Sequence, residues 1–387
     1  MSTKTDQNKD NEIITITAAD MPAVIESHSD RLAWSLEHKG HRRGCTTPLF
    51  LALPGVGKSE ISLSVASSLG RKYYDVRAGS YLPSDVRIPA INREVGSSCY
   101  YGNEEFPFVQ LPGVNADDAI CVNWEELLDA SLPMFKMCKQ AMNDNSIGNL
   151  FFPENTLHVA VSNGLDHGCM SERMPLSNAN RMAWYEVKPD LASFQEWLEE
   201  VGLYPELAAF MRSNNDVPYD IDPGKWDGKS NFASFRTLEE FGKLVNSDLM
   251  VVENDKRYMK SIASDRLLRA KINAILGHKA GMKAYKYLEL YEAVGSIESL
   301  LDDPENCPIP PELNKKWIVA CKLAGYANKS NLNAVMTVAG RLTGGGSGKG
   351  FMGTFVAKSI SKQKPSLKEE PRMRKWIGEN FSDLCGR

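Results

Sequence analysis

Short apolar runs alternate with longer amphipathic stretches in the first half of the chain. Pro48–Leu53 is a continuous apolar run that Pro54-Gly55 ends, and a helical period follows from Lys58 to Leu69. An apolar run of this kind is typical of a strand that is buried on both faces. Four further runs follow, at Tyr73–Val76, Ala119–Trp124, Leu157–Val161 and Ala183–Val187. Strands that alternate with helices predict a doubly wound, parallel α/β sheet.

The pattern changes after Asp190, where helical periods replace the β-like runs. Helices are expected at Leu191–Val201, Pro205–Arg212, Arg236–Val245, Ser261–Leu276 and Glu312–Tyr326. The polar N-terminus carries too little apolar surface to order itself, and the glycine run at 344–350 is typical of a flexible joint. We therefore expect four parts: a flexible lead-in over 1–19, an α/β domain over 20–190, an all-helical domain over 191–295, and a helical extension with a basic tail over 296–387.

The composition excludes several classes of protein. The 387 residues are 42% hydrophobic and 24% charged, which is typical of a globular chain and excludes disordered and collagen-like ones. A net charge of −4 provides no chain-wide attraction to nucleic acid or anionic membranes. The sequence contains no run of about eighteen apolar residues, which a membrane-spanning helix would need. The eight cysteines are scattered without a C-x-x-C pair, so we expect reduced thiols and a cytoplasmic protein.

A phosphate-binding loop is the strongest chemical signal. Ala52-Leu53-Pro54-Gly55-Val56-Gly57-Lys58-Ser59 has Walker A spacing, with alanine in the place of the first glycine, and it joins the first strand to the following helix. Lys58 would bind the β and γ phosphates, and the Ser59 hydroxyl would hold Mg²⁺. The alternative is a glycine turn that only connects the two elements. The predicted nucleotide-binding residues are Pro54, Gly55, Val56, Gly57, Lys58, Ser59 and Glu60.

Two other predicted strands end in polar side chains. Glu125 and Glu126 follow the run that ends at Trp124, and Asn163 follows the run through Val161 and Ser162. Glu125 suits a Mg²⁺ ligand, Glu126 a base that activates water, and Asn163 a contact to the γ phosphate or to that water. Each has a simpler alternative. Paired acids also stabilise a helix N-terminus, and Asn-Gly is a common turn.

In their order, these motifs resemble those of an AAA+ ATPase of the MoxR type. The resemblance extends over roughly residues 20–293. It includes Leu82–Pro89 after the first helix, Pro175–Arg181 before a strand, and Ser234-Phe235-Arg236 at the start of a helix. It implies a P-loop AAA+ fold, a helical lid over 191–295, ATP and Mg²⁺ as cofactors, and ATP hydrolysis.

The same resemblance implies roles for three arginines. Arg181 would be an arginine finger that reaches the nucleotide of the neighbouring subunit, with Arg173 as a second candidate, and Arg236 would contact the γ phosphate from the lid. A guanidinium suits both roles because it stays charged and binds phosphate oxygens in pairs. A surface salt bridge is the alternative for each. A finger that acts between subunits implies a ring, which we expect to be a homo-hexamer.

The implied function is the remodelling or assembly of a protein client, with a von Willebrand factor A domain protein as the implied partner. In the resembling family, insertions in the large domain line a pore or a substrate face, and 143–152 and 164–175 are the corresponding connections here. Two residues depart from the family pattern. Ala52 is tolerable because Gly55 and Gly57 make the turn, whereas Glu125 in place of aspartate predicts slower hydrolysis.

The C-terminal segment supports a rival function. From Arg341 to Lys375 it carries nine basic residues against Glu369 and Glu370, which could hold nucleic acid for an ATP-dependent motor or loader. We favour a solvated tail as the meaning of this run. A nucleotide-gated assembly protein that barely hydrolyses ATP is a third alternative.

Overall fold

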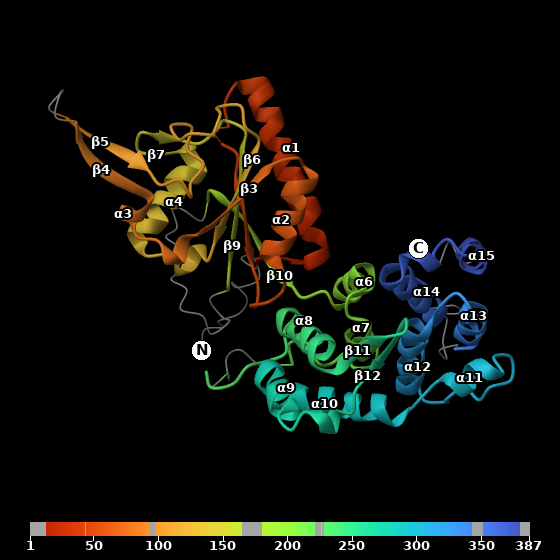
Figure 1. The fold of residues 1–387 in the computed structure, drawn as a ribbon. Coiled ribbons are helices and arrows are strands. Elements are labelled where there is room, and N and C mark those ends of the chain that lie inside the picture. The colour runs from red at the N-terminus through yellow and green to blue at the C-terminus, as the bar shows by residue number, and fades with distance from the viewer. Residues whose placement is uncertain are drawn as a thin grey trace, which may run out of the picture. The chain divides into compact units, whose positions relative to one another are not determined.

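The computed structural model describes residues 13–42, 44–92, 97–164, 180–220, 226, 228–342 and 351–379. These residues fall into two compact units (Figure 1). The first comprises the described residues up to Asp190 together with Trp226, and the second comprises the others.

A six-stranded parallel sheet forms the centre of the first unit, in the order β1-β10-β2-β9-β6-β3. Its strands are β1 (Ile14–Thr17), β2 (Thr47–Leu51), β3 (Lys72–Arg77), β6 (Ile120–Glu125), β9 (Thr156–Ser162) and β10 (Met182–Lys188). From β2 the chain crosses to the edge strand β3 and returns through β6 and β9 to the neighbouring position. The predicted α/β class with a parallel sheet is confirmed.

Helices cover both faces of this sheet. The helices α1 (Met21–Lys39) and α2 (Lys58–Ser68) pack on one face, and α4 (Leu132–Asp144) packs on the other (Figure 1). Alternate residues of a strand point to opposite faces. In β6, Val122 and Trp124 belong to the core that contains the buried residues of α4. Cys121, Asn123 and Glu125 therefore face α2.

The first strand corrects the predicted lead-in over 1–19. Ile14–Thr17 forms β1, which pairs in parallel with β10 through Ile14↔Tyr185 and Ile16↔Val187. All four residues of β1 are β-branched, a composition that favours a strand where an edge is available. The edge is created by β10, which lies more than 160 residues further along the chain, so local reasoning could not supply it.

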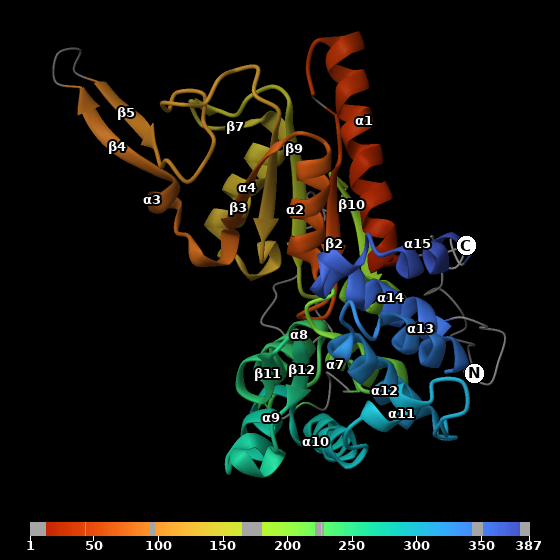
Figure 2. The same cartoon turned by 45° about the vertical axis from the view of Figure 1, so that its right-hand side comes forward.

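Two antiparallel hairpins are inserted between the strands of the sheet. The first consists of β4 (Arg87–Asn92) and β5 (Ser97–Gly102), preceded by α3 (Pro83–Val86), and it extends away from the sheet (Figures 1 and 2). The second consists of β7 (Ser146–Ile147) and β8 (Leu150–Phe151). It occupies the segment 143–152, which the sequence predicted as a polar connection. The segment predicted at 164–175 lies outside the described residues from Leu165 on.

The second unit is mainly helical. Its helices are α6 (Leu191–Val201), α7 (Pro205–Ser213), α8 (Phe235–Leu244), α9 (Leu268–Leu276), α10 (His278–Ala293), α11 (Glu298–Asp302), α12 (Leu313–Tyr326), α13 (Leu332–Arg341), α14 (Phe351–Gln363) and α15 (Pro371–Glu379). The prediction of an all-helical domain was wrong at one place, because β11 (Met250–Glu253) and β12 (Lys256–Met259) form an antiparallel hairpin. The helix predicted at 261–276 starts at Leu268, after a short 3₁₀ turn.

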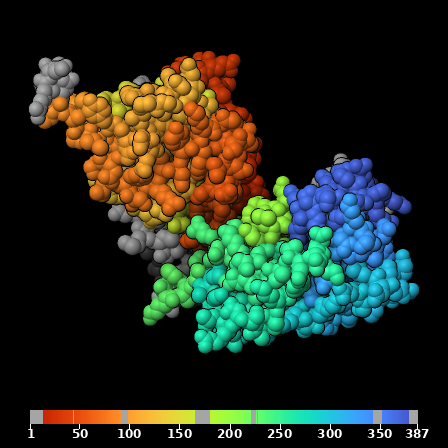
Figure 3. Space-filling model, in the orientation of Figure 1, coloured from red at the N-terminus to blue at the C-terminus, as the bar shows by residue number. Residues whose placement is uncertain are grey.

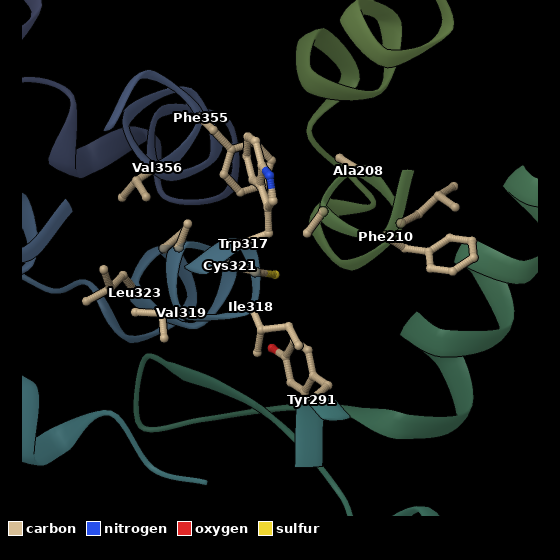
Figure 4. Close-up of a cluster of buried hydrophobic side chains, with 14 of the residues drawn as sticks. Ala208, Phe210, Tyr291, Trp317, Ile318, Val319, Cys321, Leu323, Phe355 and Val356 are labelled. Atoms are coloured by element: carbon tan, nitrogen blue, oxygen red, sulfur yellow. The ribbon is translucent and has the colours of Figure 1, made fainter. Parts of the chain in front are cut away.

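One hydrophobic core runs through the whole second unit. Figure 4 shows Phe210 of α7, Tyr291 of α10, Trp317 of α12 and Phe355 of α14 around the same interior. Trp317 and Phe355 meet edge to face, with ring centroids 5.3 Å apart. The expected boundary near residue 295 therefore does not separate two cores.

The basic C-terminal segment is not a solvated tail in its described part. In α14 and α15, Phe355, Ile360 and Met373 are buried in the core. Lys364 Nζ donates to the carbonyl oxygens of Asp255, Gly325 and Ala327 at 2.6, 2.7 and 2.6 Å. Other basic groups are also engaged within the chain: Lys358 with Glu199, Arg374 with Glu369, and Arg341 with carbonyl oxygens of Pro304 and Cys307. The glycine joint at 344–350 lies outside the described residues.

The described residues also bear on the predicted reduced thiols and on the predicted absence of a membrane-spanning helix. The described cysteines are all free thiols: Cys45, Cys99, Cys121, Cys138, Cys307 and Cys321. Within the described ranges, no helix combines the length and the apolar character that crossing a membrane requires.

Candidate active site

The phosphate-binding loop has the backbone that its glycines allow. Gly55 and Gly57 have φ angles of 78° and 97°, a left-handed region that side chains rarely adopt. The first helical residue of α2 is Lys58, and apart from its two chain neighbours no described residue has an atom within 4 Å of the position that a Cβ on Gly57 would take. Val56 is buried, Pro54 is half-buried, and Glu60 is exposed on the first turn of α2. The loop therefore leaves room beside the N-terminus of α2, where an anion is stabilised.

The Lys58 side chain lies across this loop and reaches the neighbouring strand. The residue is only 8% exposed. Its Nζ donates to the carbonyl oxygens of Ala52 and Leu53 at 3.2 and 3.3 Å, and to Asn163 Oδ1 at 3.5 Å. β2 and β9 are adjacent and parallel, so their carboxyl ends meet at one edge of the sheet. The sheet thus brings together a lysine and an amide that are 105 residues apart in the chain.

Ser59 and Glu125 also come together at this edge. Burial raises the pKa of the Glu125 carboxyl, with a smaller contribution in the same direction from the negative charge of Asp75. Hydrogen bonding from Ser59 and the positive charge of Lys58 oppose this rise and favour the carboxylate. A hydroxyl and a carboxylate that face each other at a phosphate site are suitable ligands for Mg²⁺, which needs only one or two protein ligands when phosphates supply others.

A polar cluster that the sequence-based predictions did not include continues beneath α2. Asn123 is fully buried on β6, and its Nδ2 donates to Glu125 Oε1 at 2.7 Å. Asp75 pairs with Asn123 in the register of β3 and β6, and burial raises the pKa of its carboxyl. The available signal was the polar pair Asn123 and Glu125 at alternate positions of the otherwise apolar β6, which puts these side chains on one face.

Glu126 follows directly after β6 in an unusual conformation. Its φ of 54° is left-handed, which costs a non-glycine residue on the order of 1 kcal/mol and is most common at functional sites. The side chain is exposed and lies beside Gly79, where an added Cβ would be 3.3 Å from Glu126 Oε2. The backbone thus turns Glu126 out of the sheet, while Glu125 remains half-buried.

Arg181 lies at the opposite edge of the sheet from the phosphate-binding loop. Its carbonyl oxygen accepts a hydrogen bond from Thr47 N at 3.4 Å, at the amino ends of β10 and β2. β2 has five residues, and the steps of ~3.3 Å between them separate its first and last residues by about 13 Å. An exposed arginine in this position cannot serve the loop at the other end of its own β2.

Arg236 belongs to the second unit and is exposed on the first turn of α8. Ser234 and Thr237 cap this helix reciprocally: the Ser234 hydroxyl accepts from Thr237 N, and the Thr237 hydroxyl accepts from Ser234 N. A cation is unfavourable near the positive end of a helix dipole, so the site would gain from a bound anion. Arg173, the second candidate for the finger, lies outside the described residues.

Comparison with known proteins adds little to this geometry. No protein-family model matches the chain, and no curated protein matches its sequence. A crystal structure of a protein from Cytophaga hutchinsonii, named there as a candidate ATPase, is 11% identical, with a TM-score of 0.32 over 83% of this chain and 81% of that one. A point mutant of RuvB from Thermotoga maritima is 9% identical, with a TM-score of 0.30 over 74% of this chain and 79% of that one. At identities and TM-scores this low, neither structure assigns a role to any residue of this chain.

Proposed function

We propose that the chain is an AAA+ ATPase that binds ATP with Mg²⁺ at the loop 54–60. The observation that carries this proposal is the meeting of Lys58 with Asn163, and of Ser59 with Glu125, at the carboxyl edge of one parallel sheet. This edge is where α/β sheets bind ligands. The strand order supports the same assignment, since β2, which leads into the loop, lies beside β9, which leads to Asn163, and β9 lies beside β6, which ends in the acids.

The residues present fit a nucleotide and a divalent cation. The space beside Gly57 admits phosphate, and Lys58 can exchange its contacts to loop carbonyls for phosphate oxygens. Ser59 and Glu125 would hold Mg²⁺. When bound, Mg²⁺ would neutralise charge on the phosphate oxygens and make the γ phosphorus easier to attack.

Each remaining residue has one task in the proposed hydrolysis. Asn163 orients the attacking water, and Glu126 accepts its proton as the water oxygen bonds to the γ phosphorus and the bond to the β–γ bridging oxygen breaks. Lys58 stabilises the charge that develops on the phosphate oxygens. Glu126 is suited to the role of base because it is exposed and turned out of the sheet.

Arg181 requires a second subunit if it acts as a finger. It lies at the wrong edge to reach its own loop, so it would complete the site of a neighbour in a ring, for which we propose a homo-hexamer. Arg236 would contact the γ phosphate from the lid formed by the second unit, and a bound phosphate would relieve its position at the N-terminus of α8.

We further propose a protein client in preference to nucleic acid. The hairpin β4–β5 exposes Ile88, Ile91 and Tyr101 at 60, 77 and 63% and lies on the molecular surface (Figure 3). In its described strands Arg87 is the single charged residue, and its guanidinium stacks on Tyr100 at 4.3 Å. Such a surface suits apolar segments of a protein. Engagement of the C-terminal lysines and arginines within the chain weakens the nucleic-acid alternative. A von Willebrand factor A domain partner follows from the MoxR resemblance alone.

The test is a pair of measurements on the wild type and Glu126→Gln. Wild type should bind ATP in the presence of Mg²⁺ and release phosphate, whereas Glu126→Gln should bind ATP with similar affinity and lose turnover by ~10²-fold or more. A capture experiment with Glu126→Gln and ATP should then retain a protein rather than DNA. Unchanged turnover in this variant would defeat the assignment of the base, and absence of ATP binding by the wild type would defeat the proposed function.

A further inference from the structure

An amide is buried in the middle of the strand that carries Glu125. Asn123 is 0% exposed, and its neighbours along β6, Val122 and Trp124, are apolar and equally buried. Its Oδ1 has no hydrogen-bond partner among the described residues. A buried polar atom without a partner destabilises a fold. Because its unpaired Oδ1 destabilises the fold, we look for a role of Asn123 other than stability.

The amide nitrogen of Asn123, in contrast, forms a short hydrogen bond. Asn123 Nδ2 donates to Glu125 Oε1 at 2.7 Å, a length typical of a hydrogen bond to a charged group. Hydrogen bonding from Asn123 also reaches Asp75, its register partner on β3. The amide therefore hydrogen-bonds the Glu125 carboxylate and also acts on the carboxyl of Asp75 on the neighbouring strand.

Glu125 needs such a contact more than an aspartate would. Its side chain has one more rotatable bond, so it can leave the position that faces Ser59. The negative charge of Asp75 also acts on it from the same face of the sheet. A donor held rigidly in the sheet offsets both effects, because it selects one rotamer and stabilises the negative charge of the Glu125 carboxylate.

We propose that Asn123 is a positioning residue that holds the longer carboxylate of Glu125 at Ser59 for Mg²⁺. The inference rests on the proposed function, since it assigns how one of the two metal ligands is held. It does not make Asn123 a ligand. The proposal predicts that substitution of Asn123 reduces the gain in nucleotide affinity that Mg²⁺ provides. The affinity without Mg²⁺, which Lys58 and the loop supply, should not change.

The test compares Asn123→Val with wild type in the full chain. The dissociation constant of the non-hydrolysed analogue AMP-PNP is measured by calorimetry with Mg²⁺ and with EDTA. The loss of one charge-assisted hydrogen bond should reduce the Mg²⁺-dependent gain in affinity by about tenfold or more, with the affinity in EDTA unchanged. Cys121→Val is the matched control, because Cys121 is buried on the same face of β6, one position further from Glu125 along that face; it should behave as wild type.

Two further measurements distinguish positioning from packing. Without nucleotide, Asn123→Val should melt at the same temperature as wild type or higher, since it removes the unpaired Oδ1. In a Glu125→Asp background the same substitution should change the Mg²⁺-dependent gain less than about threefold, because the shorter side chain needs no such restraint. A purely structural role predicts the reverse: a lower melting temperature and an equal effect in both backgrounds.

The possible failures can be told apart. If wild-type affinity does not respond to Mg²⁺, the proposed function fails. If Asn123→Val shows the same Mg²⁺-dependent gain in affinity as wild type, the positioning role is overturned. It is also overturned if the substitution reduces this gain by the same factor in the wild-type and Glu125→Asp backgrounds. Loss of the Mg²⁺ response in Glu125→Asp itself would overturn the explanation by side-chain length.

Discussion

Lys58 and Asn163 show how a few residues carry the proposed chemistry. In the described structure the Lys58 ammonium is held by two carbonyl oxygens of its own loop and by the Asn163 amide oxygen. All three contacts are to neutral groups. A triphosphate would replace them with charged oxygens, which bind a lysine more strongly.

Lys58→Ala should therefore remove nucleotide binding with little effect on the fold. The loss of charged hydrogen bonds worth ~2–3 kcal/mol predicts a reduction in ATP affinity of about 30- to 150-fold. Equilibrium binding of a fluorescent ATP analogue measures this. Lys72→Ala is the control, because Lys72 forms an exposed ion pair with Asp118. Equal affinities for the two variants would contradict the assignment of the loop.

Two buried histidines predict how the first unit responds to pH. Burial lowers the pKa of His28 to about 4, and burial lowers the pKa of His158 well below its usual value. His158 Nδ1 accepts from Trp124 Nε1 at 3.1 Å, so its Nε2 carries the hydrogen and the ring is neutral. Unfolding restores a pKa near ~6.5 to both, and the unfolded state then binds protons that the folded state does not.

The stability of the first unit should therefore be intact above pH ~6.5 and fall as the pH decreases towards 4. The slope for each histidine approaches ~1.4 kcal/mol per pH unit in that window. Calorimetric unfolding between pH 7.5 and 4.5 checks this, with His28→Gln expected to flatten the slope relative to the wild type. A slope that is unchanged in this variant would exclude His28 as a source of the dependence.

At the scale of elements, the hairpin β4–β5 presents apolar side chains to solvent. The strands β4 and β5 carry large apolar or aromatic side chains on both faces: Ile88 pairs with Tyr101 on one, and Tyr100 lies on the other, with the Arg87 guanidinium over its ring. A two-stranded hairpin that packs on no core is only marginally stable by itself. Binding of an apolar client segment would stabilise it.

Substituting Ile88→Ser and Tyr101→Ser together should weaken client capture by the Glu126→Gln variant at least tenfold. ATP turnover in the otherwise wild-type chain should remain within about twofold of the unsubstituted protein, since neither residue lies at the sheet edge that carries the site. Pull-down yield and phosphate release measure the two effects. Val252→Ser on β11 is the control, because Val252 is an exposed apolar residue of the hairpin β11–β12 in the second unit. Full capture by the double variant would remove the hairpin from the client surface.

The helix α14 offers a direct test of the revised C-terminus. Phe355 is 1% exposed and packs on Trp317. Phe355→Ala should lower the unfolding free energy of the second unit by ~3–5 kcal/mol, as is usual for the loss of a buried phenylalanine. Urea unfolding measures this, with exposed Lys368→Ala as the control. A decrease of less than ~0.5 kcal/mol in this unfolding free energy would instead indicate that the C-terminal segment is a solvated tail.

At the scale of the whole molecule, the position of Arg181 makes the proposed activity depend on assembly. Lys58→Ala disables a subunit as a nucleotide binder, and Arg181→Ala disables it as a donor of the finger. In a ring, an Arg181→Ala subunit still binds ATP and can receive a finger from a Lys58→Ala neighbour.

Each of these variants alone should hydrolyse ATP at least tenfold more slowly than wild type, and a mixture of the two should recover activity above the sum of its parts. Phosphate release against mixing ratio measures this, and Arg31→Ala provides an exposed arginine on α1 as the control. A mixture that only averages the two rates would show that Arg181 does not act between subunits.

Local pattern by itself determined much of the first unit. The apolar runs predicted five of the six parallel strands within one or two residues at each end. The reason is clearest for β2, β6 and β9, which are buried on both faces almost throughout and are therefore largely apolar. The loop 54–60 was predictable because its glycines and lysine have few other uses in that spacing. The common location of Glu125, Glu126 and Asn163 was predictable because the carboxyl ends of parallel strands lie at one edge of the sheet.

Long-range packing decided the rest. β1 exists only because β10 offers an edge, and the basic C-terminal helices are ordered only because α7, α10 and α12 supply apolar surface to cover. Asn123 belongs to the site only because β3 and α2 bring Asp75 and Ser59 to the same face of β6. Periodicity describes which face a residue takes, whereas the identity of its neighbours depends on contacts between segments that are far apart in the chain.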